Sequence, residues 1–531
     1  MDWTIAVYWL MDWTWALGGA ACLALASLCA LGENSFASLE KKSTGTLLRS
    51  RAWGLGFPGL IALFKLAQFH SYQSMWDSGV TVNLAWNALH GYGVWSSVIA
   101  DRSYFSVHFA FLAALLSPVL LLWKSGAALA AVQGFAVGSS ILAFHLLVGR
   151  ETKDPLTPWI ASLLALSHPL YQAVVGAVLD SSVYALPLFL WSAYFWESGR
   201  KDAATVFGLL LITTREQVPF ILVGAGLYAF SRARGRDRWL PTGLIAASIL
   251  LWAAETAVIH LAQAGWARGV DYWNTYRDLG GSREAVLGAL LREPWRFALA
   301  LFLPPAKLWT PLRVLFHAAF LPLAAGTALL PALLAWLPHQ LAPADSAYHA
   351  LNAHASVFVL GPLLWAAAKG VGRVSAKIAE RHRRFFLAAL LGVSACGLLG
   401  SGRSFYYPGL IPSSWRTAAP KAFARIPEAA SVWCDEFFLP QLGLRRYVKT
   451  FPQRLPDSFF EPGLFLPDRV LLSLYWAQRA DRASRDRILR FLKQRGFVLL
   501  FSEQDLLVLA NPATLGKEGG PPVRVAIPDT P

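Results

Sequence analysis

Long apolar runs separated by short charged segments fill residues 1–401 of this 531-residue chain. Many of these runs approach the length that an α-helix needs to cross a bilayer, which is about twenty residues. The pattern predicts a mostly α fold, a polytopic helical membrane domain with about eleven to thirteen apolar helices. The clearest runs are Ala16–Leu31, Ala127–Val148, Trp159–Val174, Leu240–Ala262, Val314–Trp336 and Phe385–Gly400.

Two apolar segments of this domain do not fit a simple crossing. Phe109–Trp123 is shorter than a full span and contains Ser117-Pro118, so we expect an interfacial or broken helix. Ala204–Phe230 lies between two basic segments, and at about 1.5 Å per residue it cannot cross twice. We therefore expect two short helices joined by a turn at Thr214–Gln217, buried in protein or lining a cavity.

Basic residues gather in the short segments between the apolar runs, which is the positive-inside pattern of membrane proteins. If these basic segments are cytoplasmic, the first span, Val7–Leu31, leaves the N-terminus outside. The later spans then bring Asp77, Asp180 and the chain after Gly402 to the outer side. The net charge of +15 thus reflects topology, because no basic face is interleaved with stacking aromatics as in nucleic-acid binders. The predicted cytoplasmic segments are Lys41–Arg51, Arg232–Arg238 and Lys369–Arg384.

The pattern changes at about residue 402, where the apolar runs shorten to strand length. Residues 402–512 predict a small α/β domain outside the membrane, with a helix at Ser484–Gln494 and a hairpin loop at Glu503–Asp505. This domain could cap a membrane cavity, or bind an acceptor or a protein partner. Residues 513–531 are rich in Gly and Pro and are predicted to be disordered. The expected strands are Ser431–Cys434, Arg446–Phe451, Val470–Tyr475, Phe497–Ser502 and Leu506–Ala510.

Asp77 stands near the start of a polar, aromatic outer loop, residues 71–108, just after an apolar run. A carboxylate at the edge of a hydrocarbon span is costly to desolvate, and such residues mark functional sites. A helix cap or a surface acid is the alternative interpretation. His108, Asp180 and Arg215-Glu216 fall on the same predicted side, so we expect one outward-facing cavity. For Arg215-Glu216, a self-neutralising structural pair is the alternative.

A segment rich in histidine and tyrosine lies between two further apolar runs. We expect Tyr348 and His349, with His339 and His354, to contact a polar head group. Several histidines also suggest a divalent metal, but no pair has the spacing of a helical metal site. We therefore expect no metal and no other cofactor.

The charged motifs resemble those of a family of bacterial membrane proteins, the domain-of-unknown-function family 2079, over Ser74–Pro512. Asp77, His108, Asp180 and Glu216 match the family pattern, whereas Val107 and Gln217 stand where the family has acids. The family-like stretches are Trp76–Gly79, Ala85–Gly93, Val107–Phe109, Leu179–Asp180, Arg215–Glu216, Tyr348–His349, Ile426–Ala430 and Leu439–Tyr447.

That family is similar in layout to the GT-C integral-membrane glycosyltransferases. The resemblance implies transfer of a sugar from a polyprenyl-phosphate donor to an acceptor, at the outer face of the bacterial inner membrane. It implies that Asp77 is the general base and that Arg215 neutralises the lipid phosphate. A lipid or anion transporter and a non-catalytic membrane assembly protein are the alternatives. The other implied substrate-binding residues are His108, Asp180, Glu216, Tyr348 and His349.

Overall fold

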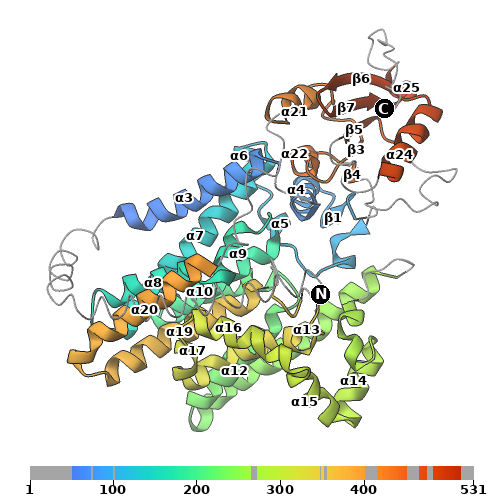
Figure 1. Cartoon of the computed structure of the whole chain (residues 1–531). Helices are drawn as coiled ribbons and strands as arrows, with labels where there is room; N and C mark the ends of the chain where they lie inside the picture. Colours follow the sequence, from blue (N-terminus) through green and yellow to red (C-terminus); the bar gives the residue numbers. More distant parts are fainter. Residues whose placement is uncertain are drawn as a thin grey trace, which may run out of the picture.

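The computed structural model describes residues 51–72, 76–99, 102–264, 272–346, 348–351, 356–400, 415–450, 466–474 and 482–515. The predicted first span Val7–Leu31, the residue His354, the junction at Gly402 and residues 516–531 lie outside this part of the chain. Within it, a large helical body is followed by a small domain of strands and short helices (Figure 1). The predicted fold class, mostly α with a C-terminal α/β domain, is therefore confirmed.

The helical body is organised around helix α7, which packs against α3, α8, α10 and α19. Around this centre, α12 packs against α13 and α18, and α20 packs against α8. The helices are α3 (Arg51–His70), α7 (Gly126–Glu151), α8 (Thr157–Ser167), α9 (Pro169–Gly176), α10 (Ala185–Glu197), α11 (Lys201–Ile212), α12 (Val218–Arg232), α13 (Trp239–Ala262), α14 (Arg283–Arg292), α15 (Pro294–Phe302), α16 (Trp309–His317), α17 (Leu321–Ala324), α18 (Leu330–Leu341), α19 (Val357–Lys377) and α20 (Glu380–Gly400).

Three helical stretches among the described residues are long and apolar enough to cross a membrane: Gly126–Glu151, Gly235–Ala262 and Val357–Lys377. The apolar windows of the first and third are mostly buried inside the protein, at 67% and 83%. Only 11% of the second window is buried. A long apolar helix of which so little is buried by protein is suited to face lipid over most of its surface, so α13 is the clearest lipid-facing element among the described residues.

Two predicted spans are broken rather than continuous. Trp159–Val174 is divided at His168, because Pro169 disfavours helical geometry for the residue before it. Val314–Trp336 is divided into α16, α17 and α18, because two consecutive residues adopt the left-handed conformation that ends a helix. The left-handed residues are Ala319 (φ 51°) and Phe320 (φ 54°).

The two segments predicted not to cross the membrane have the expected form. Phe109–Trp123 is broken into two one-turn helices, α5 (Leu112–Leu115) and α6 (Val119–Leu122). Ala204–Phe230 forms two short helices, α11 and α12, with a non-helical turn between Ile212 and Val218. Both predicted breaks are confirmed, so hydrophobic length and loop charge correctly identified runs that do not form one continuous helix, while their place in the membrane stays a prediction.

Much of the predicted outer loop, residues 71–108, is helical rather than irregular. Helix α4 (Trp76–Leu89) has fourteen residues, of which nine are buried. Asp77 therefore lies in the first turn of a helix, where a carboxylate interacts favourably with the helix dipole. The rest of the segment contains the antiparallel strands β1 (Trp95–Ser96) and β2 (Arg102–Ser103) and a 3₁₀ turn at Tyr104–Ser106.

The C-terminal domain contains a five-stranded mixed sheet in the order β4-β3-β5-β7-β6. Strand β3 is parallel to β4 and β5, whereas β7 is antiparallel to β5 and β6. All five predicted strands and the predicted helix are confirmed, while the domain boundaries stay predictions. The elements are α21 (Trp415–Phe423), β3 (Val432–Cys434), α22 (Leu439–Leu442), β4 (Val448–Thr450), β5 (Arg469–Ser473), α24 (Arg482–Gln494), β6 (Val498–Glu503), β7 (Leu506–Ala510) and α25 (Pro512–Leu515).

Asn83 of α4 links the C-terminal domain to the helical body. Its Nδ2 donates to the carbonyl oxygens of Gly443 at 3.1 Å and Arg445 at 2.7 Å. Its Oδ1 accepts from the backbone N–H of Ser97 at 3.1 Å, and the Ser97 hydroxyl accepts from the N–H of Val448 at 2.9 Å. Because these groups are buried, the bonds fix the C-terminal domain directly on α4, the helix that carries Asp77.

Gly79 permits the close approach of α4 and α22. A Cβ atom at this position would lie 2.2 Å from Cγ of Leu439, which is fully buried. We expect Gly79→Ala to lower the stability of the purified protein by about 1–3 kcal/mol, because a packed interface cannot absorb an added methyl group. Thermal unfolding measures the change.

The matched control for this prediction is Gly288→Ala on α14, where a Cβ would meet no atom within 4 Å. There the helix propensity of alanine should stabilise the protein, by up to about 1 kcal/mol. Leu439→Ala combined with Gly79→Ala should cost less stability than the sum of the two single changes, because removing the leucine atoms makes room for the added methyl group. Equal stability of Gly79→Ala and the unmodified protein would contradict this account of the interface.

Candidate functional site

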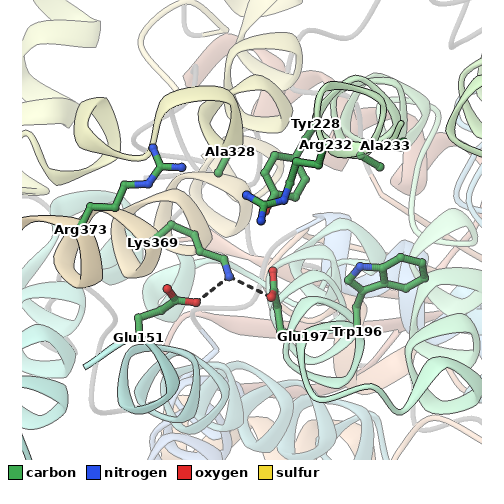
Figure 2. A pocket seen from close by; sticks show the side chains of 10 residues that line it. Glu151, Trp196, Glu197, Tyr228, Arg232, Ala233, Ala328, Lys369 and Arg373 are labelled. Atoms are coloured by element: carbon green, nitrogen blue, oxygen red, sulfur yellow. Dashed lines mark hydrogen bonds and ion pairs between the residues drawn. The ribbon is translucent and has the colours of Figure 1, made fainter. Parts of the chain in front are cut away.

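Two of the predicted cytoplasmic segments, Arg232–Arg238 and Lys369–Arg384, meet at one end of the helical body, which we call the basic end. The third, Lys41–Arg51, lies outside the described residues except for Arg51. Lys369 of α19 bridges Glu151 at 2.6 Å and Glu197 at 2.9 Å, at the C-terminal ends of α7 and α10. Arg383 forms an ion pair with Asp154 at 3.1 Å. A cavity of about 450 Å³ opens at this end, lined by charged and aromatic side chains (Figure 2). None of the predicted site residues lines this cavity.

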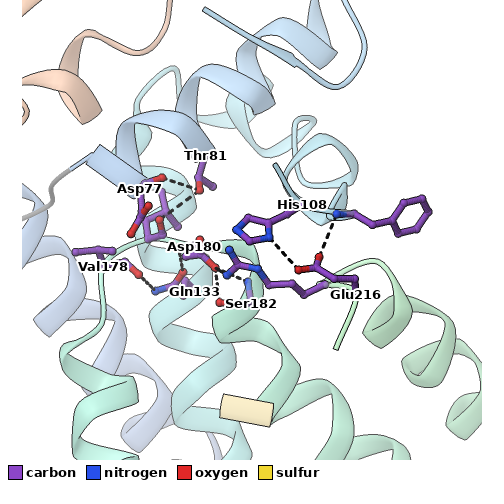
Figure 3. Close-up of polar contacts among 11 residues, drawn as sticks. Asp77, Thr81, His108, Gln133, Val178, Asp180, Ser182 and Glu216 are labelled. Carbon is purple, nitrogen blue, oxygen red and sulfur yellow. Dashed lines mark hydrogen bonds and ion pairs between the residues drawn. The ribbon is translucent and has the colours of Figure 1, made fainter. Parts of the chain in front are cut away.

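The predicted site residues lie at the opposite end of the helical body. There, hydrogen bonds from α4 and α7 hold the segment 178–180, which ends at Asp180. The backbone N–H of Leu179 donates to the hydroxyl of Ser78 on α4 at 2.8 Å. Gln133 of α7 donates to the carbonyl of Val178 at 3.1 Å and accepts from the N–H of Asp180 at 2.9 Å (Figure 3). Two helices therefore hold this non-helical segment, so the position of Asp180 is determined by buried hydrogen bonds.

The carboxylate of Asp180 performs two structural tasks. Its Oδ1 caps the 3₁₀ helix Ser181–Tyr184, accepting from the N–H of Ser182 at 2.7 Å and also from the hydroxyl of that residue. The same oxygen lies 3.5 Å from Nη1 of Arg215, and both side chains are about 5% exposed. Asp180 and Arg215 thus form a buried ion pair, in which the charge of each side chain neutralises that of the other.

Glu216 connects the α11–α12 turn to the segment His108-Phe109, which precedes α5. Its Oε1 lies 2.9 Å from Nδ1 of His108, and its Oε2 accepts from the N–H of Phe109 at 3.1 Å (Figure 3). Burial alone would raise the pKa of Glu216, but His108 and Arg215 together hold that pKa below its usual value. Burial and Arg215 lower the pKa of His108, so a neutral imidazole donates to an ionised Glu216.

Asp77 lies close to the segment that carries Asp180. The hydroxyl of Thr81, one turn further along α4, contacts the carbonyl oxygens of both Asp77 at 3.0 Å and Leu179 at 3.3 Å. Figure 3 shows the Asp77 side chain at the beginning of α4, beside Asp180 and Gln133. The sequence prediction that Asp77 and Asp180 share one end of the molecule agrees with this arrangement.

Tyr104 lies among these charges. Burial raises its pKa well above the usual value, Asp180, Asp77 and Glu216 raise it further, and Arg215 opposes them. The Tyr104 ring also makes an edge contact with the ring of His108, at a centroid distance of 6.0 Å. We call this group the charge cluster. It comprises Asp77, Tyr104, His108, Asp180, Arg215 and Glu216.

Of the two further predicted residues, Tyr348 approaches the charge cluster and His349 does not. The hydroxyl of Tyr348 lies beside Gln217 and Tyr276, and burial raises its pKa to about 12. His349 instead faces the carbonyl of His339, 3.3 Å from its Nδ1. Tyr348 and His349 are adjacent in the chain, yet their side chains contact different neighbours. Their position in one loop therefore did not predict that only Tyr348 approaches Arg215.

Sequence reasoning missed a buried carboxylate near the cluster. Glu255 of α13 is 1% exposed, and both of its oxygens lack a hydrogen-bond partner among the described residues. Its charge interacts with that of Glu216. A single acid inside the apolar run Leu240–Ala262 is a signal that could have found it, because such residues are costly in a membrane. Tyr104 carries no comparable signal, since it is an uncharged aromatic residue in a polar segment that follows Asp101-Arg102.

Metal ligation has a limited basis in this part of the chain. Within the described residues, no three His, Cys, Asp or Glu side chains gather as a metal-ligating group. The expectation that the protein works without a metal stays a prediction, as does the outward-facing cavity between Asp77 and Arg215.

These features define a class: a helical membrane protein whose small α/β domain is docked onto the helix next to a buried charge cluster. The chain belongs to the family of predicted membrane proteins DUF2079, which matches residues 71–508. By fold it is similar to ArnT from Cupriavidus metallidurans bound to undecaprenyl phosphate, with 12% identity, a TM-score of 0.47, and coverage of 89% of this chain and 100% of that one. ArnT from the same organism in the apo state has 13% sequence identity and a TM-score of 0.44, and the match covers 88% of this chain and 99% of that one. No curated protein matches the sequence.

Proposed function

We propose that this protein is a membrane glycosyltransferase that moves a sugar from a polyprenyl-phosphate donor to an acceptor at the outer face of the bacterial inner membrane. The observation that carries the proposal is the charge cluster, in which one guanidinium, Arg215, lies among three carboxylates next to α4. Buried charges in a membrane protein are retained where function requires them. A cation for phosphate and a carboxylate for a hydroxyl proton are the two groups that this transfer needs.

Arg215 is the group suited to the donor phosphate. A guanidinium can meet two phosphate oxygens at once and keeps its charge at any physiological pH. Asp180, itself held by Gln133 and Ser182, fixes the position of the guanidinium. The Tyr104 hydroxyl is a hydrogen-bond donor beside it, suited to a phosphate oxygen. The Nδ1–H of neutral His108 donates to Glu216, so its Nε2 is an acceptor, suited to a sugar hydroxyl. Glu216 holds His108 in place through its 2.9 Å contact.

Asp77 is the group suited to activate the acceptor. Its carboxylate takes the proton of the acceptor hydroxyl as the hydroxyl oxygen forms a bond to the anomeric carbon of the sugar. The bond from that carbon to the phosphate oxygen breaks, and polyprenyl phosphate leaves with its electron pair and its negative charge beside Arg215. The atoms and charges balance without a redox partner, and no cofactor takes part in this scheme.

The remaining features of the proposal concern placement. By the positive-inside rule we assign the basic end to the cytoplasm, and the charge cluster, the N-terminus and the C-terminal domain to the outside. Cytosolic nucleotide-sugars do not reach an outer site, which favours a membrane-borne donor. The C-terminal domain, bonded to α4 through Asn83, is placed to contact the acceptor or a protein partner.

The test uses the full chain in phospholipid nanodiscs with a panel of polyprenyl-phosphate sugars labelled in the sugar. We expect time-dependent release of unlabelled polyprenyl phosphate. The labelled sugar should appear attached to an acceptor, or as free sugar where water is the acceptor. Movement of intact donor between leaflets of proteoliposomes, without cleavage, would support the transporter alternative. Neither cleavage nor movement for any member of the panel would contradict the proposal and favour an assembly role.

A further inference from the structure

The cavity at the basic end has the size of a ligand-binding site. Its volume of about 450 Å³ lies within the range of about 300–1,000 Å³ that is typical of small-molecule pockets. It opens between the C-terminal ends of α7, α10 and α12 and the side of α19, so four helices contribute to its wall. Helix α12 separates it from the charge cluster, because the cluster lies at the N-terminal end of α12 and the cavity at its C-terminal end.

The charges in the cavity leave an excess of positive charge. Its lining contains three cations, Arg232, Lys369 and Arg373, and two carboxylates, Glu151 and Glu197, so the formal sum is +1. Lys369 contacts both carboxylates, at 2.6 Å and 2.9 Å. Among the described residues, neither arginine of the cavity forms an ion pair. The positive charge available to a ligand therefore resides on the two guanidinium groups.

Both guanidinium groups are held in position by uncharged neighbours. Nη1 of Arg373 donates to the carbonyl of Ala324 at 3.1 Å. The guanidinium of Arg232 lies 5.7 Å from the centre of the Tyr228 ring, a cation–π contact. Figure 2 shows the two groups on opposite sides of the cavity, above Lys369. A single anion between them could accept from both, and phosphate oxygens match the donor fork of arginine.

We propose that this cavity binds the phosphate of an anionic phospholipid from the leaflet at the basic end. Basic pockets between helices on the cytoplasmic side are typical sites for lipid phosphate groups. Trp196, which also lines the cavity, is 51% exposed, as expected of a tryptophan at the level of the head groups. The site is separate from the proposed transferase cluster and does not depend on its activity.

The experiment measures binding of phosphatidylglycerol to the full chain in phosphatidylcholine nanodiscs, by thermal shift and by native mass spectrometry. We expect phosphatidylglycerol to raise the unfolding temperature of the unmodified protein, because a ligand of the folded state stabilises it. Arg232→Gln/Arg373→Gln should weaken binding by about tenfold or more, since each hydrogen bond to a charged group contributes roughly that factor. Arg232→Lys/Arg373→Lys keeps both charges but loses the fork, and should also weaken binding.

The matched control is Arg234→Gln/Arg236→Gln, which removes the same charge from exposed residues of the neighbouring segment that do not line the cavity. It should bind phosphatidylglycerol like the unmodified protein. Equal losses in the control and cavity variants, or full binding by the cavity variants, would overturn the proposal. Inorganic phosphate distinguishes the source of the ligand. If it shifts the unfolding temperature with the same arginine dependence and displaces the lipid, the site takes a free phosphate and the lipid assignment is wrong.

Discussion

Asp77→Asn is expected to lower the rate of sugar transfer by about 10²–10⁴-fold, the usual contribution of a general base. Asparagine has nearly the same size and keeps one oxygen, but it cannot accept the acceptor proton. Asp77 also lies in the first turn of α4, where a carboxylate contributes about 0.3–1 kcal/mol through the helix dipole. The loss of stability should therefore be small, so the lower rate would not arise from unfolding. Release of polyprenyl phosphate measures the rate, and thermal unfolding measures stability.

Asp202→Asn is the matched control for this prediction. Asp202 is likewise an acid in the first turn of a helix, α11, but it is exposed and follows Arg200-Lys201 at the basic end. The control should lose a similar amount of stability and keep the full rate of transfer. Full activity of Asp77→Asn would remove the general base from the scheme and leave the transporter and assembly alternatives ahead.

Hydrophobic length and turn residues predicted much of the fold. The five C-terminal strands follow from short apolar runs between turn residues, and the breaks in Phe109–Trp123 and Ala204–Phe230 follow from runs of the wrong length. The division of Val314–Trp336 into three helices was missed, although Pro322 lies in the run. The mean hydropathy of a long segment stays high when it contains one proline, so it does not reveal a break in the helix. Helix α4 was missed because its buried face is largely small and polar, and because it is buried by α22 of the C-terminal domain as well as by the neighbouring α5.

Of the charge cluster, the sequence predicted Asp77, His108, Asp180, Arg215 and Glu216 and missed Tyr104. Asp77, Asp180 and Arg215 interrupt or border apolar runs, so the cost of burying them marked their positions in advance. Tyr104 becomes a member only because the loop after α4 folds back to the α11–α12 turn, through the Phe109–Glu216 contact. Such a contact joins residues more than one hundred positions apart, and local sequence carries no information about it.

Arg215→Gln is expected to destabilise the protein by about 3–5 kcal/mol, the usual effect of removing one member of a buried ion pair. The side chains of Arg215 and Asp180 are both about 5% exposed, so water cannot replace the missing guanidinium. Adding Asp180→Asn should recover most of this loss, because the uncompensated carboxylate is then neutral while asparagine Oδ1 can still accept from Ser182. Chemical denaturation of the three variants in nanodiscs measures these differences.

The stable double variant then separates a structural pair from a phosphate-binding one. If Arg215 serves only to neutralise Asp180, the double variant, in which neither group is charged, should bind polyprenyl phosphate as tightly as the unmodified protein. If Arg215 binds the donor phosphate, the double variant should be folded and yet bind polyprenyl phosphate about tenfold or more weakly, since a hydrogen bond to a charged group contributes about 1.5–3 kcal/mol. We expect the second result. Unchanged affinity in a folded double variant would show that the phosphate is held elsewhere, and the role proposed for Arg215 would be wrong.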